Sequence, residues 1–316
     1  MTDSATAPNA SDVLDIAIIG AGPAGLTAGL YAARAGMDAA VFERVSPGGQ
    51  LAQTEQLENY PGFPEGTEGF ALAWSMKQQA DRFGVRSVSE EVTGVDLASD
   101  PKVLSTPFGT HRARAVIVAT GARPRKLGVD GEDELAGRGV SYCATCDGNF
   151  FRGKTVAVVG GGNTAAADAL YLARICEKVY LIHRRDRLRA TAVYHERLAG
   201  LPNVEFVWNA TVARLEADGD GALAAVAVRD VNTGEERTLA VSGLFVAVGT
   251  QPNTEFLGGA LELDAAGYIV AGEDGAASVP GVWAAGDVRT KALRQVVTAV
   301  ADGAVCAEQA AERLSL

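Results

Sequence analysis

The chain has 316 residues, 47% of them hydrophobic, and a formal net charge of −11 at pH 7. Its length predicts roughly two globular domains of about 150 residues each. The acidic balance argues against nucleic acid and anionic membranes as partners, because both attract basic surfaces. Four cysteines are too few for a disulfide-rich scaffold of this size. Cys176 and Cys306 stand alone in apolar segments that look helical, so we expect small buried side chains there.

The N-terminal stretch MTDSATAPNASD, residues 1–12, is small and polar and predicts a flexible tail. It lacks the basic residues and the apolar run of a signal peptide, and no later apolar stretch approaches the roughly 20 residues that span a bilayer. We therefore expect a cytoplasmic protein without a membrane partner.

The chain contains an internal repeat. Residues 16–34, IAIIGAGPAGLTAGLYAAR, align without a gap with residues 156–174, VAVVGGGNTAAADALYLAR. Each copy runs from an apolar stretch typical of a buried strand, through a glycine-rich turn, into residues that favour a helix. One such pattern is a weak signal, but two in register predict two turns that hold a dinucleotide pyrophosphate at a helix N-terminus. The expected turn residues are Gly20, Gly22 and Gly25 in the first copy and Gly160, Gly162 and Ala165 in the second.

The end of the following strand distinguishes the two copies. In the first, Glu43 lies about 20 residues beyond the turn, where a carboxylate binds the ribose hydroxyls of an adenosine. In the second, the matching position holds His183, Arg184 and Arg185, with Arg189 a helical turn later. Guanidinium groups suit a 2′-phosphate by charge and bidentate geometry, so this turn is expected to prefer NADP over NAD. The alternative is a solvated basic helix start paired with nearby acids.

A second duplication marks where the chain passes between domains. Residues 116–124, VIVATGARP, parallel residues 244–253, LFVAVGTQPN, and each stretch runs from an apolar strand into a glycine turn and a proline. The expected domains are a first nucleotide-binding domain formed by 13–121 and 248–316, and a second one, 122–247, inserted between these segments.

The stretch CATCDG places Cys143 and Cys146 three positions apart and Asp147 directly after them. This spacing is typical of a disulfide that is easily reduced and re-formed, with the thiolate as the working form. Half of a zinc site is the rival interpretation, but no second cysteine pair or nearby histidine pair supplies the other ligands. Asp147 is placed to exchange a proton with a cysteine. The plainer interpretation is a turn aspartate before Gly148.

With these motifs the chain resembles the low-molecular-weight thioredoxin reductases over nearly its whole length. The motifs GAGPAG, PGGQL, ENYPGFP, ATGARP, GVSYCATCDG, VVGGGNTA, HRRDRLRA and AAGDVRTKALRQV occur in the order found in that family. The resemblance implies an α/β fold with two Rossmann-like nucleotide-binding domains, the NADPH domain inserted into a discontinuous FAD domain. It also implies a homodimer that reduces the disulfide of thioredoxin, with Cys146 against the flavin and Cys143 attacking the substrate.

The resemblance also implies the cofactor contacts. Those to FAD are Gly20, Gly22, Pro23, Ala24, Gly25, Glu43, Arg44, Gly48, Gly49, Gln50, Leu51, Asn59, Gly286, Asp287, Val288, Arg294, Gln295 and Val296. Those to NADPH are Gly160, Gly162, Asn163, Thr164, His183, Arg184, Arg185 and Arg189, and no metal site is expected. One departure is that many members carry two glutamates where this chain has Ala167 and Asp168.

The favoured function is therefore an NADPH-dependent thioredoxin-disulfide reductase. One alternative is a related flavoenzyme with another electron donor or a small-molecule disulfide substrate, which the arginine cluster disfavours. Another is a non-catalytic redox sensor, which would not need a dithiol, an acid and two cofactor sites. Because the dithiol and the NADPH turn belong to one domain and must each reach the same flavin, we expect that domain to rotate about the glycine-containing crossings near Gly121 and Gly249.

Overall fold

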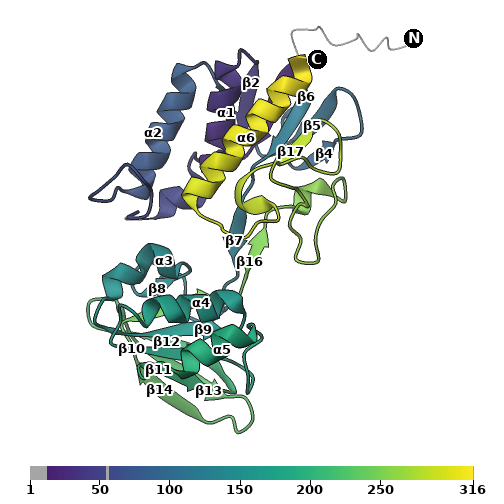
Figure 1. Cartoon of the computed structure of the whole chain (residues 1–316). Coiled ribbons are helices and arrows are strands. Elements are labelled where there is room, and N and C mark those ends of the chain that lie inside the picture. Colours follow the sequence, from purple (N-terminus) through teal and green to yellow (C-terminus); the bar gives the residue numbers. More distant parts are fainter. Residues whose placement is uncertain (1–12, 55–56, 316) are drawn as a thin grey trace. The chain divides into compact units, whose positions relative to one another are not determined.

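The chain folds into two units (Figure 1). The computed structural model describes residues 13–54 and 57–315, so the predicted flexible tail, residues 1–12, lies outside the described residues. Pro124–Thr250 forms one unit, here called the inserted unit, and the segments on either side of it form the flanking unit. Among the described residues, every helix is too short or too polar to cross a bilayer.

The flanking unit is built on one mixed sheet. Its strands lie in the order β3 (Arg86–Val88), β2 (Ala39–Phe42), β1 (Val13–Ile19), β6 (Gly109–Val118), β5 (Lys102–Thr106) and β4 (Gly94–Asp96), and β17 (Val282–Ala284) also pairs with β6. The pairs among β3, β2, β1, β6 and β17 are parallel, whereas β4, β5 and β6 pair antiparallel. The apolar residues of β1 are buried on both faces, as expected for a covered parallel strand.

Three helices of the flanking unit lie side by side (Figure 1). They are α1 (Pro23–Arg34), α2 (Gly69–Arg82) and α6 (Val296–Ser315). The approach of α6 to α1 depends on Gly303, because a Cβ there would overlap the carbonyl oxygen of Ala24. The start of α1, where the first glycine turn ends, is therefore fixed against α6.

The inserted unit contains a parallel sheet and an antiparallel sheet. The parallel strands lie in the order β11 (Val204–Val207), β10 (Lys178–Ile182), β9 (Thr155–Gly160), β15 (Gly243–Ala247) and β8 (Val140–Ser141). The antiparallel sheet consists of β12 (Ala210–Ala217), β13 (Leu223–Asp230) and β14 (Glu236–Ala240). The helices are α3 (Ala144–Asp147), α4 (Asn163–Leu172) and α5 (Ala192–Ala199).

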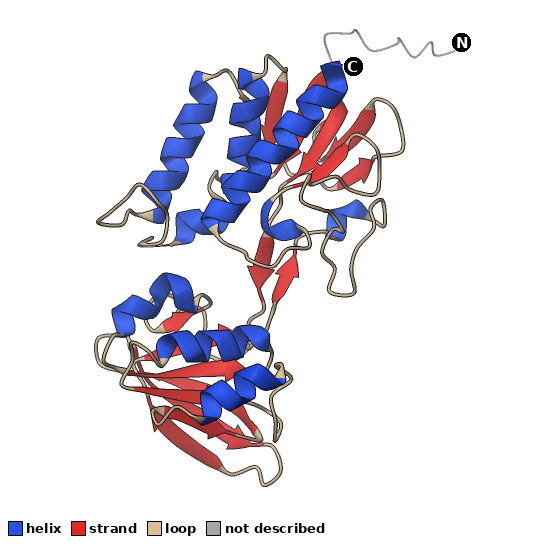
Figure 2. Cartoon of the chain, viewed as in Figure 1, coloured by secondary structure: helices blue, strands red, loops and turns tan. Residues whose placement is uncertain are grey.

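Alternate residues of β9 bury against opposite layers of the inserted unit. Val156 and Val158 belong to the cluster that contains the buried alanines of α4, while Ala157 and Val159 pack with apolar residues of the antiparallel sheet. Figure 2 shows α4 and α5 on one face of the parallel sheet. This strand is covered on both faces, which explains why its sequence is apolar throughout rather than alternating.

The two crossings between the units have matching local structure. After β6 the chain turns at Gly121 into β7 (Ala122–Pro124), and after β15 it turns at Gly249 into β16 (Thr250–Pro252). Both glycines have positive φ, +67° and +115°, a conformation that favours glycine. The strands β7 and β16 pair as a two-stranded sheet. Short 3₁₀ helices complete the fold: η2 (Gly49–Gln53), η3 (Gly148–Phe151), η4 (Glu255–Leu257) and η5 (Gly286–Val288).

The two single cysteines are buried, and one of them corrects a prediction. Cys306 lies in α6 as expected, but Cys176 lies in the turn after α4 rather than in a helix. Beyond the helix end, the side-chain amide of Asn203 donates to the carbonyl oxygens of Ala173 and Cys176, which satisfies two acceptors of this turn. Burial raises the pKa of the Cys176 thiol to about 11 and that of Cys306 to about 12. Both thiols are therefore poor nucleophiles at neutral pH.

Candidate active site

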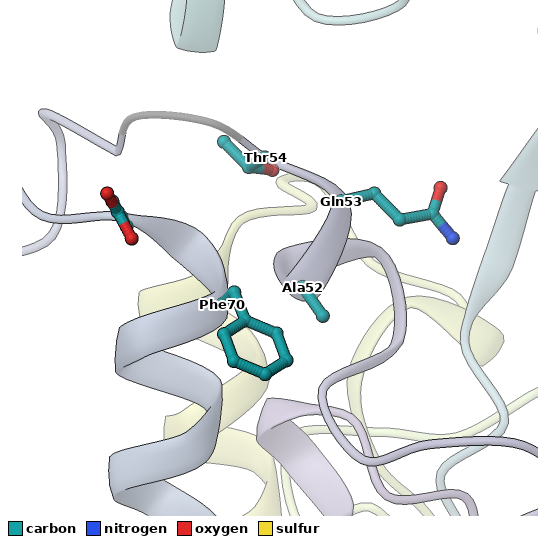
Figure 3. A pocket seen from close by; sticks show the side chains of 5 residues that line it. Ala52, Gln53, Thr54 and Phe70 are labelled. Atoms are coloured by element: carbon teal, nitrogen blue, oxygen red, sulfur yellow. The ribbon is translucent and has the colours of Figure 1, made fainter.

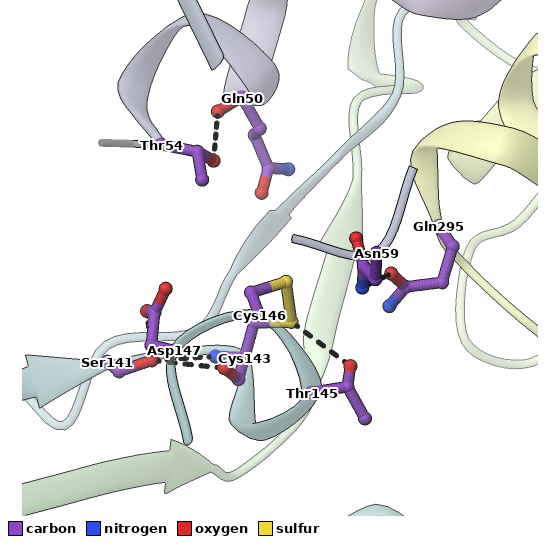
Figure 4. Close-up of a disulfide and its surroundings, with 9 residues drawn as sticks. All are labelled: Gln50, Thr54, Asn59, Ser141, Cys143, Thr145, Cys146, Asp147 and Gln295. Carbon is purple, nitrogen blue, oxygen red and sulfur yellow. Dashed lines mark hydrogen bonds between the residues drawn. A yellow bond between two sulfur atoms is a disulfide. The ribbon is translucent and has the colours of Figure 1, made fainter. Parts of the chain in front are cut away.

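Cys143 and Cys146 are joined by a disulfide at the start of α3 (Figure 4). Their Cα atoms lie 5.3 Å apart, and both side chains are partly exposed. Ala144, between them, is buried in the core of the inserted unit. Among the residues that the structure describes, no group of three or more potential metal ligands converges. The pair is thus anchored on a packed core and accessible to an attacking thiolate, the arrangement that disulfide exchange requires.

Asp147 is held by a serine that the sequence analysis did not single out. The hydroxyl of Ser141, at the end of β8, donates to Asp147 Oδ2 at 2.6 Å, and Ser141 Oγ accepts from the backbone amide of Cys143 at 3.1 Å (Figure 4). Ser141 is itself buried. Its side chain therefore fixes the acid and the first cysteine relative to each other. A serine two positions before a cysteine carries no recognisable signal, so only the structure reveals it.

A second carboxylate holds the segment that leads to the dithiol. Glu132 is buried and accepts hydrogen bonds from the backbone amides of Leu127 and Gly128 at 2.9 and 2.8 Å. It also accepts from the hydroxyl of Tyr142, the residue before Cys143, at 2.8 Å. Burial, together with the hydrogen bond to Glu132, raises the pKa of Tyr142, so the phenol stays protonated. Glu132 thus orders the polypeptide before Cys143 and was also missed from the sequence.

The first glycine turn has the geometry predicted for it. Gly20 adopts φ of +104°, and a Cβ at Gly25 would overlap the Gly20 carbonyl oxygen, so α1 can begin this close to β1 only with glycine there. At Gly22 a Cβ would meet no atom within 4 Å. The turn is therefore packed on its helix side and open at Gly22, which leaves room for a ligand to approach the backbone.

Glu43 follows β2 and binds the turn itself. Its carboxylate accepts from the backbone amide of Ala21 at 3.0 Å and from that of Val45 at 3.2 Å. The backbone amide of Gly48 donates to the carbonyl of Ala21 at 2.7 Å, so the segment after Glu43 folds over the same turn. Gly48 needs its positive φ of +112° for this approach.

Gly286 and Asp287 also lie at the start of α1. A Cβ at Gly286 would lie 2.9 Å from the Cβ of Ala24, and Gly286 adopts φ of +79°. Asp287 Oδ1 is buried and has no hydrogen-bond partner among the described residues. Burial raises the pKa of Asp287. A buried carboxylate oxygen without a donor is costly, so this atom marks a place for a ligand that can donate a hydrogen bond.

Five of the other residues predicted for the first cofactor have protein partners through their side chains. Gln50 donates to the carbonyl of Ala122, and Asn59 donates to Gln295 Oε1 at 3.0 Å. The guanidinium of Arg294 lies 4.0 Å from the ring centroid of Tyr268. Arg44 instead points to solvent and pairs with Glu91 at 3.4 Å, so it does not converge on the turn. The remaining predicted residues are Pro23, Gly49, Leu51, Val288 and Val296.

The second glycine turn lies over His183. Gly160 adopts φ of +152°, and Gly162, like Gly22, would meet no atom at its Cβ position. At Gly161 a Cβ would overlap the imidazole ring of His183, which is 5% exposed. Burial and three neighbouring arginines lower the pKa of His183, so the ring is neutral at physiological pH. His183 thus supports the turn by packing rather than by charge.

Arg184, Arg185 and Arg189 are exposed beside this turn and form no ion pair with any described residue. The backbone amide of Arg189 donates to the Gly161 carbonyl at 2.6 Å, and the Asn163 side chain accepts from the amide of Thr191 at 3.0 Å. These bonds hold the arginine segment to the turn. The arrangement does not support pairing with nearby acids, and it leaves a positive surface open to an anionic group.

A surface hollow in the flanking unit lies apart from these turns in the sequence. Figure 3 shows it lined by Ala52, Gln53, Thr54, Glu68 and Phe70. Its lining includes one acidic side chain and no basic one, so it does not suit a phosphate.

Comparisons with known proteins agree with this geometry. Residues 14–303 match the model of the pyridine nucleotide-disulphide oxidoreductase family. The chain is 46% identical over 308 residues to a thioredoxin reductase of Streptomyces clavuligerus, covering 96% of this chain and 95% of that protein. It is 46% identical over 297 residues to a thioredoxin reductase of Treponema pallidum, covering 94% and 96%.

Solved structures give the same result. The thioredoxin reductase of Streptococcus pyogenes superposes with a TM-score of 0.89 at 40% identity, covering 96% of this chain and 99% of that one. That of Giardia duodenalis gives 0.89 at 38% identity, with the same coverage. The chain belongs to the thioredoxin reductase family. Its fold is the α/β arrangement of two Rossmann-like nucleotide-binding domains, one inserted into the other.

Thioredoxin reductases use FAD and NADPH. The residues of this chain fit both cofactors. The open turn at Gly22 and Asp287 Oδ1, which has no partner in the part of the chain that the structure describes, suit a dinucleotide that can donate hydrogen bonds. The arginines beside the second turn, which pair with no acid of residues 13–54 and 57–315, suit a phosphorylated ribose.

The departure at 167–168 has a local consequence in α4. Ala167 is exposed, whereas Asp168 is partly buried and has no hydrogen bond to any described residue. Burial alone raises the pKa of Asp168 from 3.8 to about 6. Asp168 is therefore a carboxylate whose charge destabilises the folded state at neutral pH.

Replacing Asp168 with asparagine is expected to stabilise the protein above pH 6. The folded state binds more protons than the unfolded state between pH 3.8 and about 6, so the free energy of unfolding falls as pH rises through that range. Asp168→Asn removes this loss and should add about 3 kcal/mol at neutral pH, shrinking to nearly zero at more acidic pH. Denaturant unfolding at several pH values measures it. Asp186→Asn, at an exposed position, is the control, and a gain independent of pH would contradict the assignment.

Replacing Ser141 with alanine is expected to slow disulfide exchange. The substitution removes the hydroxyl that binds Asp147 and the Cys143 amide. Loss of one charge-assisted hydrogen bond, worth about 1.5–3 kcal/mol, should lower turnover about tenfold. Ser141→Thr keeps the hydroxyl and should retain most of the activity. Equal loss in both variants would show that packing, rather than the hydroxyl, matters at this position.

Proposed function

We propose that this protein is an NADPH-dependent thioredoxin-disulfide reductase. The observation that carries the proposal is the partly exposed Cys143–Cys146 disulfide in the same unit as the arginine-bearing glycine turn. FAD is assigned to the flanking unit and NADPH to the inserted unit, with the contacts predicted from the sequence. When bound, these cofactors supply the two electrons that reduce the disulfide.

The family resemblance assigns the roles of the two cysteines in the dithiol chemistry. The Cys143 thiolate attacks the disulfide of thioredoxin, forming a mixed disulfide and releasing one substrate thiolate. The Cys146 thiolate then attacks Cys143 Sγ, which re-forms the Cys143–Cys146 disulfide and releases the second substrate thiolate. Asp147, held by Ser141, supplies a proton to a departing thiolate. Thioredoxin gains two electrons and leaves as a dithiol, with one proton from Asp147 and the other from solvent, and the protein returns to the oxidised pair.

We also propose, from the family resemblance, a cytoplasmic homodimer. The inserted unit must rotate during turnover, because the dithiol and the second glycine turn both have to reach one flavin. The positive-φ glycines at the crossings, Gly121 and Gly249, support this hinge. A flavoenzyme with a different electron donor, or one acting on a small-molecule disulfide, is the second candidate, and the unpaired arginines disfavour it.

The function is tested by the substrate dependence of NADPH oxidation. The purified protein should oxidise NADPH rapidly only when oxidised thioredoxin is added. Cys143→Ser should lose thioredoxin turnover while NADPH still bleaches the flavin absorbance, because the substitution removes only the attacking thiol. Cys176→Ser is the matched control and should behave as wild type, since that thiol is buried. Rapid turnover without thioredoxin would contradict the proposal.

Cofactor choice is tested at the arginine cluster. Changing Arg184 and Arg185 to alanine removes the charges assigned to the 2′-phosphate. Each charge-assisted contact contributes about 1.5–3 kcal/mol, so KM for NADPH should rise at least about tenfold while KM for NADH barely moves. Arg187→Ala, an exposed arginine in the same segment, is the control. Equal changes for both cofactors would mean that the cluster does not bind the 2′-phosphate.

A further inference from the structure

A compact group of charges lies between α6 and the loop that follows β17. Asp302, on α6, accepts from the backbone amide of Gly286 at 2.9 Å, from Arg289 Nε at 2.9 Å and from Lys291 Nζ at 2.8 Å. A further bond joins Arg289 Nη2 to the other carboxylate oxygen at 2.7 Å. The side chains of Asp302, Arg289 and Lys291 are only 11%, 11% and 7% exposed.

This group is ionised despite its burial. Burial acts to raise the pKa of Asp302, but the hydrogen bonds from Arg289 and Lys291 outweigh it and hold the pKa below its usual value. A buried carboxylate that two cations and a backbone amide satisfy is stable, whereas removing it would leave two buried cations without their main partner.

All the groups that Asp302 binds flank Asp287. Gly286 precedes Asp287 and Arg289 and Lys291 follow it, while Arg294 donates to the Asp287 carbonyl at 3.4 Å. The backbone of this loop is therefore fixed on both sides of Asp287. Its side-chain Oδ1 is nevertheless buried and unpartnered among the described residues.

Two cations, Lys291 and Arg294, lie close enough to Asp287 to lower its pKa electrostatically. The Arg294 guanidinium is held by the backbone carbonyls of Asp287 and Arg289, whereas the Lys291 ammonium is held by the Asp302 carboxylate. Lys291 is therefore the cation that loss of Asp302 would free. An ion pair between Lys291 and Asp287 would use the oxygen that a ligand needs. Asp287 Oδ1 is therefore available only while Lys291 binds Asp302.

We propose that Asp302 is a positioning residue for FAD, which fixes the Gly286–Val288 turn and holds Lys291 away so that Asp287 Oδ1 stays free to bind the cofactor. The inference rests on the proposed binding of FAD in the flanking unit. Asp302 lies on the C-terminal helix next to Gly303, which contacts the start of α1, so one residue ties the helix to the turn.

The test measures FAD affinity of the full-length protein, from the fluorescence of flavin released on dilution. Asp302→Asn frees Lys291 to pair with Asp287 and should weaken FAD binding at least about tenfold, the value of one charge-assisted hydrogen bond. The double variant Asp302→Asn with Lys291→Met removes the freed cation and should restore most of the affinity. A merely structural role predicts no such rescue. Glu308→Gln, an exposed acid on the same helix, should bind FAD as wild type does.

The measurements distinguish failure of this inference from failure of the proposed function. Unchanged affinity in Asp302→Asn, or a loss that Lys291→Met does not reverse, would overturn the inference while leaving the proposed function intact. If Asp302→Asn does not fold, Lys291→Met alone still decides, because it leaves Asp302 in place and should keep or tighten FAD binding; a tenfold loss would refute the role assigned to Lys291. Failure of the wild-type protein to retain FAD would instead refute the proposed function.

Discussion

The close approach of each strand end to the helix that follows it is the constraint on which both units depend. A Cβ at Gly25 would overlap the Gly20 carbonyl oxygen, and a Cβ at Gly160 would lie 2.8 Å from the Cβ of Ala165. With side chains at these positions the helices would have to move away from the sheets. With glycine, α1 and α4 begin within a few residues of β1 and β9, and their N-terminal amides face the place where a pyrophosphate can bind.

The same backbone device serves two different ligands because the charges around it differ. In the flanking unit, both carboxylate oxygens of Glu43 accept hydrogen bonds from backbone amides. Glu43 therefore holds the conformation of the turn and also places a negative charge beside it. In the inserted unit the matching residue, His183, is buried and neutral and supports the turn by packing. The arginines after it have no acidic partner among the described residues. Fold is shared between the units, and function is set by these side chains.

Buried carboxylates organise the segments that carry the chemistry. Glu132 orders the chain before the dithiol, and Asp302 orders the turn that presents Asp287. Glu132 accepts from backbone amides at 127 and 128 and from the hydroxyl of Tyr142, and Asp302 accepts from Gly286, Arg289 and Lys291. Several donors offset the cost of burying each carboxyl group, so each one fixes the conformation of the chain that supplies its donors. Ser141 does the same with a neutral hydroxyl for Asp147 and Cys143.

The sequence by itself determined the two glycine turns, the dithiol, Glu43 and the arginine cluster, because each depends on residue types at fixed short spacing within one strand, turn and helix. It also determined the fold class, because each copy of the strand, glycine turn and helix pattern is a continuous stretch of sequence that can be recognised by itself. Only the tertiary structure assigned roles to Ser141, Glu132 and Asp302, whose partners lie on other elements or across loops of ordinary composition. The turn that holds Cys176 after α4 was likewise visible only in the structure, where Asn203 from a distant loop binds its carbonyl oxygens. Hydrogen bonds between side chains and remote backbone groups depend on how the elements pack, and no short sequence pattern records that packing.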